Sequence, residues 1–273
     1  MTLRLAGPLL LVGAGKMGGA LLEGWLRQGL DPTRVFVCDP NPPPEVAALI
    51  ARHRIGTGAS AELPARPSVI LLAVKPQVID KVLPSVAPLM GKQTVALSIA
   101  AGRTIASLQG HLPEGSAIVR SMPNIAASVG HSMTVACAGA AVTRDQALEC
   151  NMLLEAVGQV VWVDDESLLD VVTAISGNGP AYVYLLTECL AEAGRKAGLD
   201  SDLANQLARA TVEGAGELLR RSDLSPAELR ANVTSPKGTT AAALEVLMGK
   251  NGLYELLSRA IAAAVKRSRE LSS

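Results

Sequence analysis

The chain has 273 residues, enough for two domains, and 49% of them are hydrophobic, which argues for a packed core and against intrinsic disorder. The 25 basic residues balance the 25 acidic ones, and aromatic residues make up only 2% of the chain. Neither nucleic acid nor an anionic membrane surface is therefore expected as a main partner.

Cysteine and histidine are scarce and scattered. These residues are Cys38, Cys137, Cys150, Cys189, His53, His111 and His131. The cysteines form no C-x-x-C pair, so we expect buried thiols in a reducing compartment. The histidines lack metal-ligand spacing, so we predict no metal site. The N-terminus shows no signal pattern and no apolar run could span a membrane, so we expect a cytoplasmic protein without a membrane partner.

A strand–turn–helix pattern lies near the N-terminus, where the apolar run Leu9–Val12 meets a loop that contains G-x-G-x-x-G. Gly13 permits a tight turn, Gly15 lets the backbone approach a pyrophosphate, and Gly18 lets the following helix pack close to the strand. The helix start offers free N–H groups and a positive dipole end to an anion. We therefore predict that residues 13–18 bind a dinucleotide.

Small or polar residues follow the next predicted strands. These strands cover residues 35–39, 68–74, 94–99, 117–119, 132–138 and 160–163. Asp39 lies 21 residues after Gly18, close to the expected place of the acid that binds a ribose hydroxyl. Lys75 follows a buried strand, at the sheet edge where ligands gather, and the residues alone leave open whether it meets the cofactor or is a solvated loop lysine. Ala101 belongs to a small-residue stretch that leaves room for a ligand.

Strand-like runs disappear after residue 163. Helices are predicted at 45–53, 144–157, 166–175, 180–197, 201–221, 226–231, 240–248 and 252–271, with Thr143 as an N-cap. We therefore predict an α/β fold with two domains: a Rossmann-like, doubly wound domain over 1–163 and an all-helical domain over 164–273. The second domain is too rich in Ala and Leu to bury them alone, so a partner subunit is expected to cover it.

Six motifs together resemble those of the pyrroline-5-carboxylate reductase family over nearly the whole chain. They span residues 13–18, 73–76, 98–102, 122–124, 176–182 and 233–240, and the last two are the most specific. The resemblance implies NADPH- or NADH-dependent reduction of the cyclic imine 1-pyrroline-5-carboxylate to L-proline, the last step of proline biosynthesis. It also implies a homodimer of interleaved C-terminal helices that often assembles into a decamer.

The segment 233–240 combines a turn with the start of an Ala-rich helix. Unpaired N–H groups at such a start can bind a carboxylate, and Ser235, Thr239 and Thr240 add hydroxyl groups. The residues alone favour an ordinary capped helix. The resemblance reverses this preference and implies a substrate site.

The resemblance assigns a role to each matching residue. It implies that Thr240 is catalytic and forms a hydrogen bond with the ring nitrogen, and that the turn Gly177–Pro180 closes the pocket at a subunit interface. The substrate-binding residues that it implies are Ser235, Gly238, Thr239, Thr240, Gly179 and Pro180. The full set of predicted cofactor-binding residues is Gly13, Ala14, Gly15, Lys16, Met17, Gly18, Asp39, Val74, Lys75, Pro76, Ala101 and Asn124.

Two residues depart from the family pattern. Lys237 stands where members commonly have a second glycine, so it is strained if the position needs a positive φ; otherwise its ammonium group helps to attract the substrate. Asp39 stands where members that prefer NADPH usually have a small or basic residue. A carboxylate repels a 2′-phosphate and accepts a hydrogen bond from a 2′-hydroxyl, so we expect NADH to be accepted, with the preference between NADP and NAD open.

Two other functions share the predicted fold. A dehydrogenase of the β-hydroxyacid type needs a general base, commonly a lysine on the helix after a glycine turn. No lysine lies between Pro180 and Gly194, and Lys196 comes too late, which disfavours this alternative. A non-catalytic sensor of the reduced cofactor predicts binding without turnover.

Overall fold

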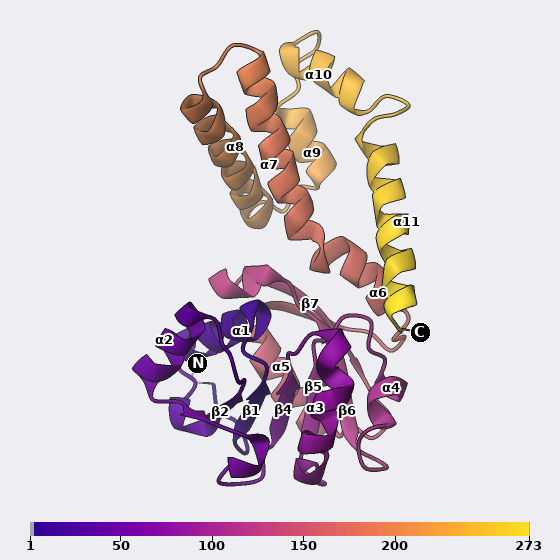
Figure 1. The fold of residues 1–273 in the computed structure, drawn as a ribbon. Helices are drawn as coiled ribbons and strands as arrows, with labels where there is room; N and C mark the ends of the chain where they lie inside the picture. The colour runs from indigo at the N-terminus through magenta and orange to yellow at the C-terminus, as the bar shows by residue number, and fades with distance from the viewer. Residues whose placement is uncertain (1–2, 273) are drawn as a thin grey trace. The chain divides into compact units, whose positions relative to one another are not determined.

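The computed structural model describes residues 3–272 (Figure 1). The chain forms two compact units. Of the described residues, 3–178 together with 264–272 form the first unit, and 179–263 form the second. The chain leaves the first unit after Asn178 and returns to it within the last helix.

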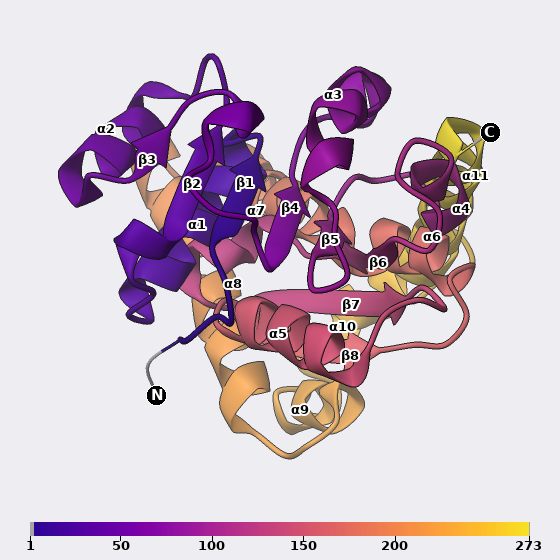
Figure 2. The same ribbon diagram turned by 90° about the horizontal axis from the view of Figure 1, so that it is seen from below.

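The first unit is built on an eight-stranded sheet with the order β3-β2-β1-β4-β5-β6-β7-β8 (Figure 2). The strands are β1 (Leu9–Val12), β2 (Val35–Cys38), β3 (Gly56–Thr57), β4 (Val69–Leu72), β5 (Val95–Ser98), β6 (Ala117–Met122), β7 (Ser132–Ala138) and β8 (Gly158–Trp162). Neighbouring strands run parallel except at the β6–β7 pair, which is antiparallel. The chain reverses its direction of winding between β1 and β4, which makes the sheet doubly wound.

Both faces of the sheet are covered. The helices of this unit are α1 (Lys16–Arg27), α2 (Pro44–His53), α3 (Ile79–Val86), α4 (Ile105–Gln109), α5 (Arg144–Glu155) and α6 (Leu168–Val172). Leu9 and Leu11 of β1 pack into a core with α1, α2 and α5, whereas Leu10 and Val12 pack into a second core with α3 and α4. Because side chains alternate between faces, a central strand buried on both sides must be continuously apolar, which is the pattern predicted here.

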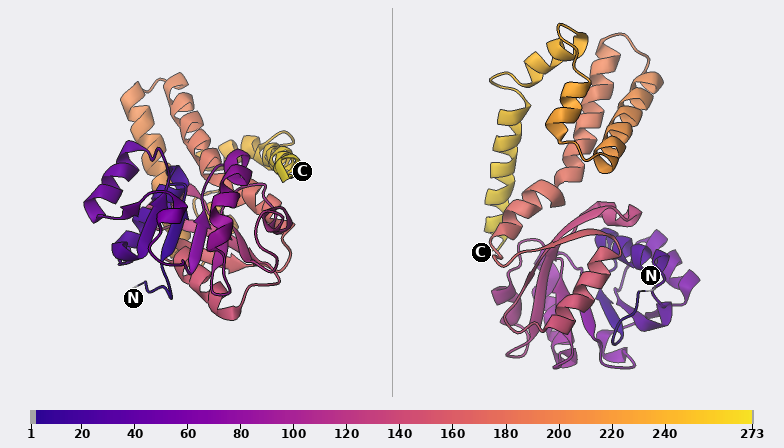
Figure 3. Two further views of the ribbon diagram at one scale, coloured as in Figure 1. Left: turned by 60° about the horizontal axis from the view of Figure 1, so that its bottom comes forward. Right: turned by 180° about the vertical axis from the view of Figure 1, so that it is seen from behind.

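The second unit is helical. It contains α7 (Gly179–Lys196), α8 (Ser201–Arg221), α9 (Pro226–Asn232), α10 (Thr239–Leu247) and the first half of α11 (Leu253–Ser272). Helices α7 and α8 lie side by side (Figures 1 and 3). Among residues 179–263, all of which the structure describes, only Ala191, Ala204 and Ala208 are buried. Large apolar side chains such as Leu185 and Leu218 stay exposed, so the unit alone does not enclose a core of large apolar side chains.

The predicted fold class is confirmed, and most predicted elements lie within a few residues of the observed ones. Thr143 caps α5 as predicted, and its side chain and that of Gln146 form a reciprocal capping box. The two-residue strand β3 was not predicted. In the described residues, no helix combines the length and apolarity needed to cross a membrane.

One predicted turn is wrong. The segment Gly177–Pro180 is helical, apart from a bend at Asn178 between a π-helical turn (Thr173–Gly177) and α7. The amide of Asn178 donates to the carbonyl of Thr173 over 2.9 Å, which is the i→i+5 bond of a π-helix. Pro180 does not interrupt α7 because it occupies the first helical turn, where its missing N–H costs no hydrogen bond.

Candidate functional site

The three glycines of the 13–18 loop meet different surroundings. Gly13 has φ +92°, and a Cβ there would come within 2.8 Å of the Val74 side chain. A Cβ on Gly18 would lie 2.2 Å from the carbonyl oxygen of Gly13, so α1 packs directly against the loop. A Cβ on Gly15 would meet nothing within 4 Å. The chain's own packing therefore leaves open space over Gly15, which a phosphate group fits.

Asp39 lies beside this loop, immediately after β2. Its Oδ2 accepts a hydrogen bond of 2.6 Å from the amide of Ala14, and its Oδ1 accepts one of 2.9 Å from the amide of Asn41. The carboxylate is half-buried and held at both oxygens. Its negative charge is thus fixed next to the glycine loop.

The other predicted cofactor residues of this unit follow the same edge of the sheet. Val12 of β1 is in register with Cys38 of β2 and with Leu72 of β4, so these strands end level with one another. Lys75 follows β4 as an exposed side chain, and the half-buried Ala101 follows β5. Parallel strands therefore bring the loops that begin at residues 13, 39, 73 and 99 to one edge.

Asn124 is buried, with 8% of its surface exposed, and both the nitrogen and the oxygen of its side-chain amide form hydrogen bonds. Its Nδ2 donates to the carbonyl of Ser176 over 3.0 Å, and its Oδ1 accepts from the amide of Ala126 over 3.1 Å. The side chain thus joins the end of β6 to the π-helical turn. This internal role was not predicted, because it depends on a contact with Ser176 that no local sequence pattern indicates.

The segment before α10 belongs to the second unit. The amide of Gly238 donates to the carbonyl of Ser235 over 3.0 Å and closes a turn with Pro236 at its second position. Gly238 is the N-cap of α10, has no side chain to cap the helix, and would bring a Cβ within 2.6 Å of Ser235 Oγ. The first intrahelical bond runs from the Ala242 amide to Gly238. The amides of residues 239–241 therefore remain uncapped at a positive helix end.

Three hydroxyl groups surround this helix start. Ser235 and Thr239 are exposed and Thr240 is half-buried. Within the described part of the chain, none of these hydroxyls forms a hydrogen bond. The segment therefore holds three hydroxyls and three amide donors ready for an anionic ligand.

Lys237 adopts φ +59° at the third position of this turn. Proline at the second position and a positive φ at the third are typical of a type II turn, which favours glycine at the third. The sequence left open whether this position needs a positive φ. The structure shows that it does, so the Lys237 backbone is strained. Lys237 is exposed and forms no ion pair with any described residue.

Gly179 and Pro180 form the first two residues of α7. A Cβ on Gly179 would meet nothing within 4 Å, whereas a Cβ on Gly177 would lie 2.7 Å from the Met122 side chain. The contact at 177 is with the terminal methyl group of the flexible Met122 side chain, which can move aside, so the internal packing requires a glycine at neither position.

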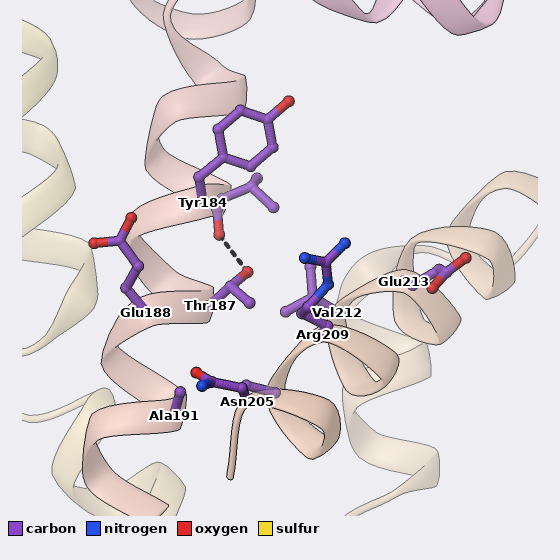
Figure 4. Close-up of a pocket in the computed structure, with 10 residues that line it drawn as sticks. Tyr184, Thr187, Glu188, Ala191, Asn205, Arg209, Val212 and Glu213 are labelled. Carbon is purple, nitrogen blue, oxygen red and sulfur yellow. Dashed lines mark hydrogen bonds between the residues drawn. The ribbon is translucent and has the colours of Figure 1, made fainter. Parts of the chain in front are cut away.

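A groove of about 650 Å³ runs between α7 and α8 (Figure 4). It is lined by Val183, Tyr184, Thr187, Glu188, Ala191, Asn205, Ala208, Arg209, Val212 and Glu213. The Thr187 hydroxyl donates to the carbonyl of Val183 over 2.8 Å within α7. None of the predicted site residues lines this groove.

The cysteines offer no activated nucleophile in the first unit. Burial raises the pKa of the Cys38, Cys137 and Cys150 thiols, which therefore stay protonated at neutral pH. Cys189 on α7 is exposed, so the expectation that every thiol is buried is wrong at this position. The described residues contain no cluster of side chains suited to a metal ion.

Comparisons with known proteins assign both halves of the chain. Residues 166–271 match the family model described as pyrroline-5-carboxylate reductase dimerisation, and residues 9–102 match that described as NADP oxidoreductase coenzyme F420-dependent. The pyrroline-5-carboxylate reductase of Pseudomonas aeruginosa is 38% identical over 262 residues, covering 96% of this chain and 95% of the relative. That of Pisum sativum is 37% identical over 264 residues, covering 96% and 94%.

Solved structures agree with these matches. A pyrroline-5-carboxylate reductase from Coxiella burnetii superposes with a TM-score of 0.89 at 33% identity, over 98% of this chain and all of that one. The Plasmodium falciparum pyrroline carboxylate reductase with NADP bound superposes with a TM-score of 0.85 at 30% identity, over 98% of this chain and 99% of that one.

Proposed function

Because the chain belongs to the pyrroline-5-carboxylate reductase family, we propose that it reduces 1-pyrroline-5-carboxylate to L-proline with NADPH or NADH. It is thus an oxidoreductase that acts on a C=N group in proline biosynthesis.

The observation that carries the proposal is that two helices begin at a glycine and have no side-chain cap. Helices α1 and α10 each begin at a glycine N-cap without a side-chain cap, at Gly15 and Gly238. Side chains cap α4, α5, α8 and α9, whereas α2, α3 and α6 lack a side-chain cap but have no glycine at the N-cap. An uncapped start with a glycine leaves backbone amides open to an anion. We assign the cofactor pyrophosphate to the start of α1 and the substrate carboxylate to the start of α10.

The reaction needs few chemical groups from the protein. A bound reduced nicotinamide supplies the hydride. The amides of residues 239–241 and the hydroxyls of Ser235 and Thr239 hold the carboxylate and so orient the ring. Thr240 forms a hydrogen bond with the ring nitrogen as it changes from iminium to amine. The absence of an activated thiol in the first unit is compatible with this mechanism, which calls for no nucleophile.

We propose that Asp39 lets the enzyme accept NADH. Its carboxylate lies next to the amide of Ala14, so a 2′-phosphate placed there meets a fixed negative charge, whereas a ribose hydroxyl meets an acceptor. The remaining cofactor contacts proposed are those of Lys16, Met17, Val74, Lys75, Pro76, Ala101 and Asn124. Because Asn124 already bonds Ser176, its contribution is to position the π-helical turn beside the site.

We further propose that two copies of the chain cover each other's helical units. The match to the dimerisation model and the exposed apolar side chains of residues 179–263 support this assembly. The α7–α8 groove and the start of α7 at Gly179 and Pro180 then face a partner subunit. A decamer of dimers and a reducing cytoplasmic location without nucleic-acid partners complete the proposal. The four free cysteines support a reducing location, and the zero net charge supports the lack of a nucleic-acid partner. The domain division at 163/164 also remains a proposal, whereas the compact units of the structure divide after Asn178.

The alternative hydroxyacid dehydrogenase lacks a base in the required place. Lys196 is the last residue of α7, is largely exposed, and pairs with Glu192 over 3.5 Å. A lysine engaged in this way at the helix end is poorly suited to abstract a substrate proton.

The test is a spectrophotometric assay of cofactor oxidation with 1-pyrroline-5-carboxylate, using the unaltered protein and two variants at Thr240. Thr240→Val keeps the shape and loses the hydroxyl, so kcat should fall about a hundredfold with cofactor affinity unchanged. Thr240→Ser keeps the hydroxyl and should retain most of the activity. No turnover by the unaltered protein would leave the sensor function, and full activity of Thr240→Val would remove Thr240 from its role.

A further inference from the structure

A second cavity lies at the edge of the sheet opposite the glycine loop. It has a volume of about 890 Å³, and its walls come from the segments that precede β1, β4 and β5 and from α5. All these segments belong to the first unit. No residue of the proposed active site lines this cavity.

Glu149 of α5 is a buried carboxylate in the wall of this cavity, with 6% of its surface exposed. Its Oε1 accepts two hydrogen bonds of 2.7 Å, from the amide of Ala6 and from the hydroxyl of Ser68. Its Oε2 has no hydrogen-bond partner, and Glu149 forms no ion pair, within the described residues 3–272. The described part of the protein thus supplies hydrogen-bond donors to only one of the two carboxylate oxygens.

The free oxygen of Glu149 remains accessible. An oxygen with no hydrogen-bond partner is either fully enclosed by the protein or accessible from outside. Among the described residues, the only side-chain nitrogen or oxygen that is fully enclosed and has no partner is Nε of Arg103, so Glu149 Oε2 is not enclosed. Oε2 of Glu149 therefore keeps accessible surface. Since Glu149 lines the cavity, we take the cavity as the space that gives access to this oxygen. A hydrogen-bond donor in the cavity can reach this oxygen.

Three cations stand around the same cavity. Arg4, Arg66 and Lys92 come from three separate segments, have exposed side chains and form no ion pair with any residue from 3 to 272. Among the residues that the structure describes, Arg66 makes only a long hydrogen bond of 3.5 Å, to the carbonyl of Met90. Asp145 is the other acidic residue in the lining.

The wall around Glu149 is held in place by backbone contacts. A Cβ on Gly7 would come within 2.9 Å of Ser68, so the N-terminal segment passes close over Ser68 and brings the Ala6 amide to Glu149. Gln146, one turn before Glu149, donates to the carbonyls of Lys92 and Thr94 over 3.3 and 3.2 Å. The carboxylate is thus preorganised at a fixed place in the cavity.

We propose that this cavity binds a free α-amino acid, with the ammonium group on Glu149 Oε2 and the carboxylate on the cations of Arg4, Arg66 and Lys92. A zwitterion satisfies both signs of charge, whereas a simple anion brings no donor to Glu149 Oε2 and a simple polyamine brings no acceptor to the three cations. The inference concerns a binding site separate from the active site and does not depend on the reaction proposed above.

The experiment is isothermal titration of the full chain with L-leucine, L-glutamate, L-lysine and L-proline. At least one of them should bind the unaltered protein and Glu155→Gln, a control for an exposed carboxylate on the same helix outside the cavity. In Glu149→Gln the affinity for that amino acid should fall roughly tenfold to a hundredfold, the cost of a hydrogen bond to a charged group. Arg66→Gln should weaken binding as well. Because the Arg66 side chain is exposed, this variant is expected to fold like the unaltered protein.

Chemical analogues and one active-site variant complete the test. The N-acetyl derivative of the bound amino acid, and the amine that lacks its carboxylate, should both fail to bind. Thr240→Val should bind the amino acid as the unaltered protein does. Absence of binding by all four amino acids, equal binding by Glu149→Gln, or loss of binding in Thr240→Val would each overturn the proposal.

Discussion

Gly15→Ala separates the packing of the glycine loop from its ability to bind a ligand. The added Cβ meets nothing within 4 Å, and Gly15 already has φ −67° with an extended ψ, which alanine adopts without strain. The free energy of unfolding should therefore change by no more than about 1 kcal/mol, in the stabilising direction, because alanine restricts the unfolded chain. The same methyl group would occupy the space that we assign to the pyrophosphate.

The expected loss of affinity follows from the contacts that the methyl group displaces. Losing one charge-assisted hydrogen bond between a backbone amide and a phosphate oxygen costs about 1.5–3 kcal/mol, which corresponds to roughly 10- to 100-fold in Kd. Titration of the cofactor by fluorescence or calorimetry measures this change, and thermal unfolding of the same sample measures stability.

Gly110→Ala is the matched control. Gly110 ends α4 with an ordinary φ of −62°, and a Cβ there would be no closer than 3.7 Å to its neighbours. This variant should bind the cofactor normally. If Gly15→Ala also binds with unchanged affinity, no phosphate lies over Gly15 and the assignment of the α1 start is refuted.

Three further predictions test neighbouring parts of the account. In Asp39→Ser the ratio of kcat/KM for NADPH to that for NADH should rise about tenfold or more, because the fixed charge is removed; steady-state kinetics with both cofactors measure it, and a strong NADPH preference of the unaltered protein would contradict the argument. Lys237→Gly should gain about 0.5–1 kcal/mol of stability, because relief of about 1–2 kcal/mol of backbone strain exceeds the cost of the extra freedom of glycine in the unfolded chain. Lys237→Ala keeps the strain, so equal melting temperatures for the two variants would contradict the assignment of strain to Lys237. Sedimentation of the unaltered protein should show a dimer or a larger assembly down to micromolar concentration, and a stable monomer would contradict the assigned role of the exposed apolar side chains.

The sequence predicted the elements whose signals are local. Leu9–Val12 and Val69–Leu72 are continuously apolar, which is typical of parallel strands buried on both faces. Thr143 stands directly before a helical pattern, and a cap depends only on the next few residues. The order of the glycine loop, Asp39 and Lys75 at one edge of the sheet follows from the topology once the strands are parallel.

Features that depend on distant residues escaped prediction. The segment 177–180 resembles a turn because glycine and proline are helix breakers, yet Gly177 packs on Met122 and Asn124 bonds Ser176 some 52 residues away. Glu149 carries a charged side chain, and such side chains are ordinarily found at the protein surface. It is buried because Ser68, 81 residues away, and the amide of Ala6 supply its hydrogen bonds.

The account rests on two uncapped helix starts that bind two anions, and a crystal structure of the assembled protein with oxidised cofactor and L-proline tests it most directly. We predict the proline carboxylate within hydrogen-bonding distance of the amides of residues 239–241, the ring nitrogen beside Thr240, and the pyrophosphate over Gly15. A proline carboxylate bound elsewhere, with the start of α10 in contact with solvent alone, would contradict the account.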